Sequence, residues 1–231
     1  MSYAEHPYTA LVIGASGGIG AAIADALGDD PHCTQLQTLS RRDDGLDLTD
    51  AASVEIAAEK LAGDEGFNLI FNASGILEVG GVGPEKAFRD IDADIMARAF
   101  AVNAIGSALA LKHFMPLLKR REATAFATLS ARVGSIGDNR LGGWMSYRAS
   151  KAALNQIVRC AAIEETRRNK ASVIVALHPG TIKTPLTQKY ARGRYTASPQ
   201  DAAQSLLSVL AQLSPEHSGR FFDYAGKEVS W

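Results

Sequence analysis

The sequence predicts an α/β Rossmann fold, in which a doubly wound parallel sheet carries helices on both faces. Short apolar runs alternate about six times with longer segments of helical periodicity along the 231 residues, and this alternation is typical of sheets built from strand–helix–strand units. Right-handed crossovers between such units place helices on both sides of the sheet. Because the sequence contains no linker, repeat or low-complexity segment, we expect residues 1–231 to form a single domain.

Strands are expected where apolar and β-branched residues run for about four to eight positions between turn-forming residues. In chain order, these runs are residues 9–13, 34–39, 67–72, 123–130, 172–177 and 220–223. Helices are expected where apolar residues recur at helical spacing, at residues 19–27, 50–61, 92–118, 147–168 and 199–213. Asp50 and Ser198 are suitable N-cap residues for two of these helices.

The composition argues against several classes of partner and site. The formal net charge is −1, so neither nucleic acid nor an anionic membrane surface is expected as a partner. Cys33 and Cys160 have neither metal-ligand spacing nor the pattern of a disulfide framework, so no metal site is expected. The first apolar run follows no basic segment, and no segment reaches the roughly 20 apolar residues of a membrane span. These features favour a cytoplasmic protein.

The first predicted strand runs into a glycine-rich turn that opens a helix. The turn reads Gly-Ala-Ser-Gly-Gly-Ile-Gly over residues 14–20. Bare backbone amides at a helix N-terminus suit the pyrophosphate of a dinucleotide. A plain tight turn is the alternative, but the position directly after the first strand favours a phosphate site. The residues assigned to this site are Gly14, Ser16, Gly17, Gly18, Ile19 and Gly20.

The second predicted strand is followed by Ser40, Arg41 and Arg42, with no acidic residue at the strand end. An acidic residue here would bind the ribose 2′-hydroxyl of NAD(H), whereas an arginine would accept the 2′-phosphate of NADP(H). We therefore expect these three residues to bind the cofactor and NADP(H) to be preferred, with NAD(H) as a possible second cofactor. The alternative is that the two arginines are only solvated loop charges.

Six short motifs, in the right order and at the right separations, resemble those of the short-chain dehydrogenase/reductase family over nearly the whole chain. They are the turn of residues 14–20, Asp47-Leu48, Asn72-Ala73-Ser74-Gly75, Asn103, Tyr147-x-x-x-Lys151 and the segment from Pro179 to Thr184. Segments 130–144 and 219–231 are similar to the carbonyl-reductase branch that includes C-factor and sniffer-like proteins. The resemblance implies an oxidoreductase that interconverts a carbonyl and an alcohol with NADP(H).

The resemblance also implies where the cofactor lies. Asp47, beside Leu48, would bind the adenine amino group. The residues implied to line the ribose and the nicotinamide are Asn72, Ala73, Ser74, Gly75, Pro179, Gly180, Ile182 and Thr184. Thr184 and the backbone of Ile182 would hold the carboxamide and so decide which face of the nicotinamide ring is presented.

Tyr147 and Lys151 are the expected proton-transfer pair. Reduction of a carbonyl needs a proton for the developing alkoxide in addition to the hydride of the cofactor. Residues four apart share a helix face, so the Lys151 ammonium is expected beside Tyr147, where it would lower the tyrosine pKa from about 10. Tyr147 is then the general acid of reduction and the base of oxidation, and a solvated helix face is the alternative. The resemblance implies that Lys151 also binds the nicotinamide ribose, and that Asn103 anchors a proton-relaying water.

The chain departs from the family pattern just after the predicted strand of residues 123–130. The family's Ser-Ser-x-x-Gly reads Ser-Ala-Arg-Val-Gly here, so Ala131 stands where the resemblance implies a serine bound to the substrate oxygen. Ser130 is the first candidate to replace it and is included among the expected catalytic residues. The alternatives are a hydroxyl supplied by Ser135 and a site that works without one, at a cost of about 10²–10³ in rate by analogy with other oxyanion sites.

Two hypotheses about function therefore remain. The first is an enzyme acting on a small-molecule carbonyl or alcohol, which the intact Tyr147, Lys151 and Asn103 favour. The second is a cofactor-binding regulatory or signalling protein with little turnover, which Ala131 favours.

The substrate and the assembly are less sharply indicated. Residues 185–199 are short and polar where a lid is expected, which favours an open site for small or varied carbonyl compounds. The resemblance implies that the helices of residues 92–118 and 147–168 pack against a second subunit, which gives a homodimer or homotetramer.

Overall fold

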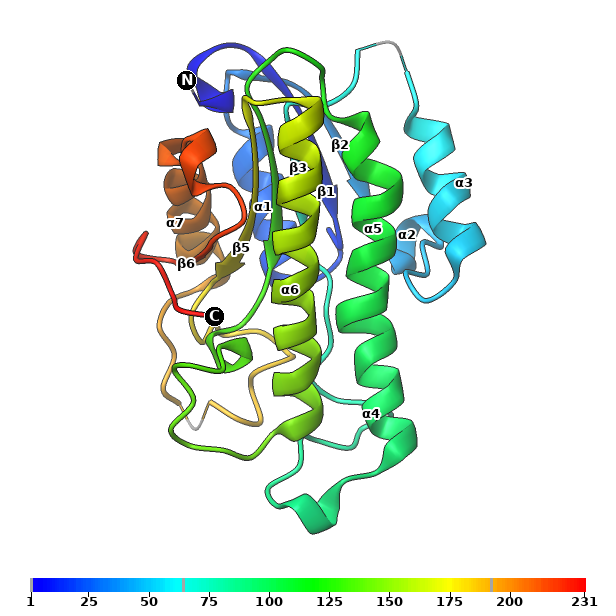
Figure 1. The fold of residues 1–231 in the computed structure, drawn as a ribbon, viewed down its shortest axis with the longest axis vertical. Coiled ribbons are helices and arrows are strands. Elements are labelled where there is room, and N and C mark those ends of the chain that lie inside the picture. Colours follow the sequence, from blue (N-terminus) through cyan, green and yellow to red (C-terminus); the bar gives the residue numbers. More distant parts are fainter. Residues whose placement is uncertain (1, 64, 192) are drawn as a thin grey trace.

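A six-stranded parallel sheet runs through the centre of the molecule in the computed structural model, which describes residues 2–63, 65–191 and 193–231 (Figure 1). The strands are β1 (Tyr8–Ile13), β2 (Cys33–Leu39), β3 (Leu69–Asn72), β4 (Thr124–Leu129), β5 (Ser172–His178) and β6 (Phe221–Asp223). Their order across the sheet is β2-β1-β3-β4-β5-β6, and every neighbouring pair is parallel. The parallel sheet confirms the predicted fold class.

Helices cover both faces of this sheet, as predicted. They are α1 (Gly18–Gly28), α2 (Arg41–Asp44), α3 (Ala51–Leu61), α4 (Ala93–Phe100), α5 (Gly106–Phe114), α6 (Met145–Arg168) and α7 (Pro199–Gln212). In Figure 1, α5 and α6 lie in front of the sheet, while α1 and α7 lie behind it. The side chains of Asp50 and Ser198 accept hydrogen bonds from the first turns of α3 and α7, so both predicted N-caps are confirmed.

Two hydrophobic cores follow from the alternation of side chains along the strands. Leu11 and Ile13 of β1 point into the core shared with α3, α5 and α6. Ala10 and Val12 point into the opposite core, which α1 and α7 close. Successive residues of a strand face opposite sides, so a strand covered on both faces buries both sets of side chains and is mostly apolar. This explains why β1 is buried along its whole length.

The predicted helix of residues 92–118 is interrupted at its centre. α4 ends at Phe100, a π-helical turn covers Ala101–Ile105, and α5 begins at Gly106. Such turns are rare and recur at functional sites; this one carries the fully buried Asn103. The segment Ala93–Leu117 is long and apolar enough to cross a membrane by length and composition alone, which the sequence reading missed. In the structure it packs on the sheet beside α3 and α6.

The third strand begins two residues later than predicted. Phe67 pairs instead with Leu118 in an isolated bridge, and the Asn68 side chain accepts a hydrogen bond from the Thr9 amide at 3.1 Å. These contacts lie at the edge of the sheet opposite the carboxyl ends of the strands.

The carboxyl ends of β1 and β3 form the crevice at which strand order reverses. From β1 the chain crosses to β2 on one side, and it then returns to β3 on the other side. Ligands of open α/β sheets bind at this point. The backbones meet closely here, because a Cβ added to Gly14 would lie 3.0 Å from the Ser74 amide nitrogen. The topology therefore places the predicted phosphate turn and the predicted ribose residues side by side.

Candidate active site

The glycine turn after β1 has a shape that side chains would fill. Gly14 has a φ of 83°, and a Cβ on Gly20 would lie 2.2 Å from the Gly14 carbonyl oxygen. α1 begins at Gly18, and its N-cap residue, Gly17, provides no side-chain cap. Its first amides are therefore available to an anion, which the helix dipole also favours. This cradle fits the pyrophosphate of a dinucleotide.

Two adjoining cavities flank the turn, with volumes of about 220 Å³ and 380 Å³. The smaller cavity reaches α2 and has the position expected for the adenosine end of the cofactor. The larger cavity extends to β4 and β5. Most of the predicted cofactor residues border one or both of them. These are Gly14, Ser16, Gly17, Gly18, Ile19, Gly20, Ser40, Arg41, Asp47, Leu48, Ala73, Ser74, Gly75, Tyr147, Lys151, Pro179, Gly180, Ile182 and Thr184. The structure thus assembles residues 170 positions apart around one crevice.

Arg42 and Asn72 are predicted cofactor residues that border neither cavity. Arg42 is directed to its neighbour Asp43, with Nε 2.9 Å from Oδ1. Asn72 is fully buried, and its Oδ1 accepts hydrogen bonds from the amide and the hydroxyl of Ser74. Asn72 therefore fixes the turn after β3 through its hydrogen bonds with Ser74. Of the two arginines, Arg41 borders the smaller cavity and Arg42 does not.

Asp47 borders the smaller cavity as a carboxylate that is already hydrogen-bonded. Its Oδ1 accepts bonds from the Thr49 hydroxyl at 2.7 Å and from the Thr49 amide at 2.8 Å. These bonds lower the pKa of Asp47 and so keep it ionised. An ionised acceptor suits an amino group such as that of adenine.

Tyr147 borders two cavities. One is the larger of the two cavities beside the glycine turn, here called the larger cofactor cavity, and the other is a third cavity of about 600 Å³. It lies in the first turn of α6. Burial raises the pKa of Tyr147 to about 12, which is opposite to the shift expected from the neighbouring ammonium. The expectation of a lowered pKa was therefore wrong, because desolvation of the phenolate causes the shift and the Lys151 ammonium does not offset it. The side chain is held in its protonated form at neutral pH.

Lys151 is directed toward the backbone and toward Gly75. Its Nζ donates a hydrogen bond to the Leu129 carbonyl at 3.0 Å, and burial lowers the pKa of Lys151 to about 8. A Cβ on Gly75 would lie 3.2 Å from this Nζ and 3.3 Å from Oδ1 of Asn103. The glycine thus leaves room for the lysine and the asparagine to approach one another beside the cavity.

The amide of Asn103 is occupied by three hydrogen bonds. It accepts one from the Ile76 amide at 2.9 Å, and it donates to the Ile76 carbonyl at 3.0 Å and to the Ser150 hydroxyl at 3.1 Å. These bonds tie the π-helical turn to the loop after β3 and to α6. Asn103 is fully buried and is therefore not a solvated polar residue of the helix.

The three residues considered for the missing serine occupy different places. Ser130 borders the larger cofactor cavity, and its hydroxyl donates to Oδ1 of Asn155. Ala131 borders both that cavity and the third cavity. Ser135 borders neither, and its hydroxyl donates to the Ser230 carbonyl. Of the two serines, only Ser130 is near the reacting position, so the Ser135 alternative was wrong.

The third cavity is covered by the segment after Thr184, which is tied down at Glu78. The carboxylate of Glu78 accepts a hydrogen bond from the Tyr190 hydroxyl at 2.6 Å and lies 2.8 Å from Nζ of Lys189. The Tyr190 ring also packs edge-on against Trp144, with centroids 5.6 Å apart. These contacts hold a partial lid in place, where the sequence favoured an open site.

Two residues that border the third cavity, His178 and Trp144, were not identified from the sequence. His178, at the end of β5, also borders the larger cofactor cavity, and its Nδ1 is buried with no hydrogen-bond partner among the described residues. Burial lowers the pKa of His178 to about 4, so its ring is neutral. Trp144 adopts a left-handed backbone with φ of 57° directly before α6. Gly142 and Gly143, directly before Trp144, were the one feature of the sequence that indicated this unusual turn.

Comparison with known sequences identifies one family model and several related proteins. The family model described as short chain dehydrogenase matches residues 8–194. A 1-hydroxy-2-glutathionyl-2-methyl-3-butene dehydrogenase from Rhodococcus sp. (strain AD45) is 32% identical over 235 residues, which span 96% of this chain and 99% of the relative. C-signal of Myxococcus xanthus is 39% identical over 145 residues, or 63% of this chain and 84% of the relative.

Solved structures share the fold over almost the full length. An NADPH-bound carbonyl reductase from chicken fatty liver superposes with a TM-score of 0.81 at 25% identity, covering 98% of this chain and 100% of the other. Carbonyl reductase Sniffer of D. melanogaster has the same TM-score and the same coverage of both chains at 19% identity.

Proposed function

Because the chain belongs to the short-chain dehydrogenase/reductase family, we propose that it is an NADP(H)-dependent oxidoreductase that interconverts a carbonyl and an alcohol. The observation that carries the proposal is the position of Tyr147, which borders the cavity next to the glycine turn and the 600 Å³ cavity at once. A proton donor there reaches both a cofactor and a substrate. The relatives support the choice of reaction, since one is named as a dehydrogenase of a hydroxy compound and another as an NADPH-bound carbonyl reductase.

The preference for NADP(H) is supported by the end of β2. Arg41 borders the smaller cavity directly after Ser40, the residue that caps α2. The carboxylates of Asp43 and Asp44 accept hydrogen bonds from the hydroxyl and the amide of Ser40 and do not border this cavity. A guanidinium fork suits a 2′-phosphate. Structure neighbours with bound NADP or NADPH point the same way.

The mechanism assigns proton transfer to the chain's own residues, and the bound NADPH supplies the hydride. Tyr147 is protonated at neutral pH, since its pKa of about 12 lies far above 7, and it donates its phenolic proton to the substrate oxygen as negative charge develops there. Lys151 lies one helical turn further along α6, where its ammonium stabilises the tyrosinate that this transfer leaves. Asn103 holds the loop after β3 against α6 and so keeps this pair aligned.

The test is the variant Tyr147→Phe. It removes one hydroxyl and keeps the ring, so we expect reduction of an active aldehyde to fall by about 10² or more, while the Kd for NADPH changes by less than about threefold. Tyr3→Phe removes a buried hydroxyl at the N-terminal end of the chain, outside the cavities, and serves as the matched control. Unchanged turnover in Tyr147→Phe would remove Tyr147 from the chemistry.

A second candidate function is favoured by Ala131, which places a methyl group where the family pattern has a hydroxyl. This candidate is a regulatory or signalling protein that binds the cofactor with little turnover. A panel of aldehydes, ketones and alcohols with both cofactors distinguishes the two functions. NADPH binding without turnover of any compound in the panel would favour the second candidate.

A further inference from the structure

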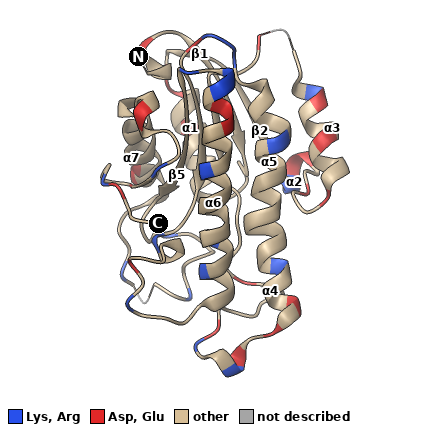
Figure 2. Ribbon diagram, in the orientation of Figure 1, with Lys and Arg blue, Asp and Glu red and all other residues tan. Residues whose placement is uncertain are grey.

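The 600 Å³ cavity beside Tyr147 has an unusually basic wall. Four arginines border it: Arg132, Arg140, Arg148 and Arg194. Among the residues that border it, Asp138 is the one carboxylate. Blue segments recur in the loops beside the lower turns of α6, which Figure 2 shows to the left of that helix. A chain whose formal net charge is −1 therefore concentrates cations at this one site.

The carboxylates near this wall neutralise only one of the four arginines. Nε of Arg132 lies 2.7 Å from Oδ2 of Asp138, and its Nη1 lies 3.7 Å from Oδ2 of the buried Asp223. Among the described residues, no carboxylate lies within 4.0 Å of the guanidinium of Arg140, Arg148 or Arg194. Three arginines thus border the cavity without a carboxylate counter-ion from the part of the chain that the structure describes.

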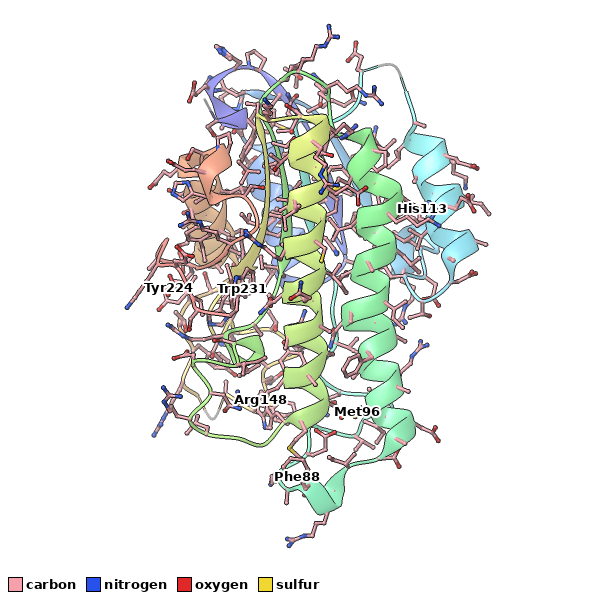
Figure 3. All side chains as sticks on the ribbon, in the orientation of Figure 1. Phe88, Met96, His113, Arg148, Tyr224 and Trp231 are labelled. Atoms are coloured by element: carbon pink, nitrogen blue, oxygen red, sulfur yellow. The ribbon has the colours of Figure 1, made fainter. Side chains whose placement is uncertain are left out.

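Arg148 is the most constrained of these three cations. It follows Tyr147 on α6 and is partly buried beside the lower turns of that helix, where Figure 3 labels it. Its Nε donates to the Gly143 carbonyl at 2.8 Å and its Nη1 to the Val133 carbonyl at 3.2 Å. Burial lowers the pKa of Arg148. A guanidinium that is fixed by backbone carbonyls and partly desolvated is stabilised most by an anion.

The rest of the cavity wall is apolar and aromatic. Leu77, Leu186 and Trp144 border it together with the arginines and Tyr147. Such a surface suits the uncharged part of a ligand, while the arginines suit an oxyanion at its other end.

We infer that the substrate is a carboxylate-bearing carbonyl or alcohol compound, whose anionic group is bound by Arg148 with help from Arg140 and Arg194. This inference rests on the proposed oxidoreductase function. It names a substrate class that is narrower than a carbonyl compound in general. The carboxylate lies away from the reacting carbon, so that an apolar segment spans the distance between the arginines and Tyr147.

The test compares an anionic aldehyde with its uncharged ester. 4-Carboxybenzaldehyde and its methyl ester, methyl 4-formylbenzoate, share the ring and the reacting group. We expect kcat/KM with NADPH to be at least about tenfold higher for the acid, because a charge-assisted hydrogen bond is made with the carboxylate only. The preference should weaken as ionic strength rises, since the arginines are partly exposed to solvent.

Variants of the arginines test whether these residues cause the preference for the acid over the ester. Arg148→Ala should reduce the acid-to-ester ratio about tenfold, and Arg148→Lys should keep part of it because the charge remains. Arg148 also holds two loop carbonyls, so loss of packing alone would slow both aldehydes equally and leave the ratio unchanged. The double variant of the exposed Arg140 and Arg194, each changed to Ala, should lower the ratio without removing those loop contacts. Arg120→Ala removes an exposed arginine before β4, away from the cavity, and should keep the wild-type ratio.

Binding measurements separate this inference from the proposed function. Calorimetric titration of the NADP⁺ complex with each of the two aldehydes requires no turnover. Tighter binding of the acid, abolished in Arg148→Ala, supports the anion site even where no aldehyde is reduced. Equal binding of acid and ester, or an acid preference that survives in both arginine variants, overturns the inference and leaves the proposed reaction untouched.

Discussion

The hydroxyl of Ser130, at the end of β4, donates a hydrogen bond to Oδ1 of Asn155 in α6 over 2.6 Å. Both side chains are buried. The bond joins the strand that ends at the reacting position to the helix that carries Tyr147. It also occupies the hydroxyl that stands closest in sequence to Ala131, so Ser130 would have to break a buried bond to reach a substrate oxygen.

The first prediction concerns Ala131→Ser. Ala131 borders both the larger cofactor cavity and the 600 Å³ cavity, so under the proposed function a hydroxyl at this position can meet the substrate oxygen without disturbing Ser130. We expect kcat for aldehyde reduction to rise at least about tenfold, and by no more than the roughly 10²–10³ that one oxyanion donor contributes. Steady-state kinetics with NADPH measure it. Ser135→Ala, which alters a hydroxyl outside these cavities, should leave kcat within about twofold, and an unchanged kcat in Ala131→Ser would mean that another group already serves the substrate oxygen.

The second prediction concerns the pH dependence of stability. Burial lowers the pKa of Lys151 from 10.5 to about 8 in the folded protein. Between these values the unfolded chain binds more protons than the folded one, so the free energy of unfolding rises with pH. From pH 7.5 to 9.5 the gain should be on the order of 1–2 kcal/mol, measured by urea denaturation. Lys151→Met should abolish this gain. The range of measurement stops below pH 10. Above pH 10 the free energy of unfolding falls as pH rises, because the pKa of Tyr147 is raised in the folded protein.

The same rise of stability with pH in Lys151→Met as in the wild type would contradict the assignment. It would show that other groups cause the gain and that Lys151 is not strongly desolvated in the folded state.

The third prediction distinguishes the two arginines after β2. Arg41 borders the cavity expected to hold the adenosine end, whereas Arg42 is turned to Asp43 at 2.9 Å. We expect Arg41→Ala to weaken NADPH binding about tenfold or more with little effect on NADH, since the arginine can contact a 2′-phosphate that NADH lacks. Arg42→Ala is the matched control and should change either Kd by less than about threefold. Fluorescence titration gives all four constants. A larger loss of NADPH affinity in Arg42→Ala than in Arg41→Ala would reverse this assignment.

Much of the architecture could be predicted from local patterns. The apolar run of β1 and the helix that starts at Gly18 are each encoded within about a dozen residues, and alternation of such units gives a parallel sheet. The interruption of the long helix between Phe100 and Gly106 could not be predicted. The π-helical turn carries Asn103, which makes hydrogen bonds to Ile76 and Ser150, 27 and 47 positions away in the sequence. Periodicity carries no information about such distant partners.

The sequence by itself determined the fold class, the family and most of the residues that border the crevice, because glycine turns and strand ends specify local backbone geometry. The tertiary structure alone decided what surrounds those residues. Burial against the loops after β4 and β5 raises the pKa of Tyr147, although its spacing from Lys151 had suggested the opposite. Folding likewise gathers Arg140, Arg148 and Arg194 from a loop, a helix and a lid onto one cavity wall. Desolvation and charge clustering depend on neighbours brought together in space, and the order of residues along the chain does not specify them.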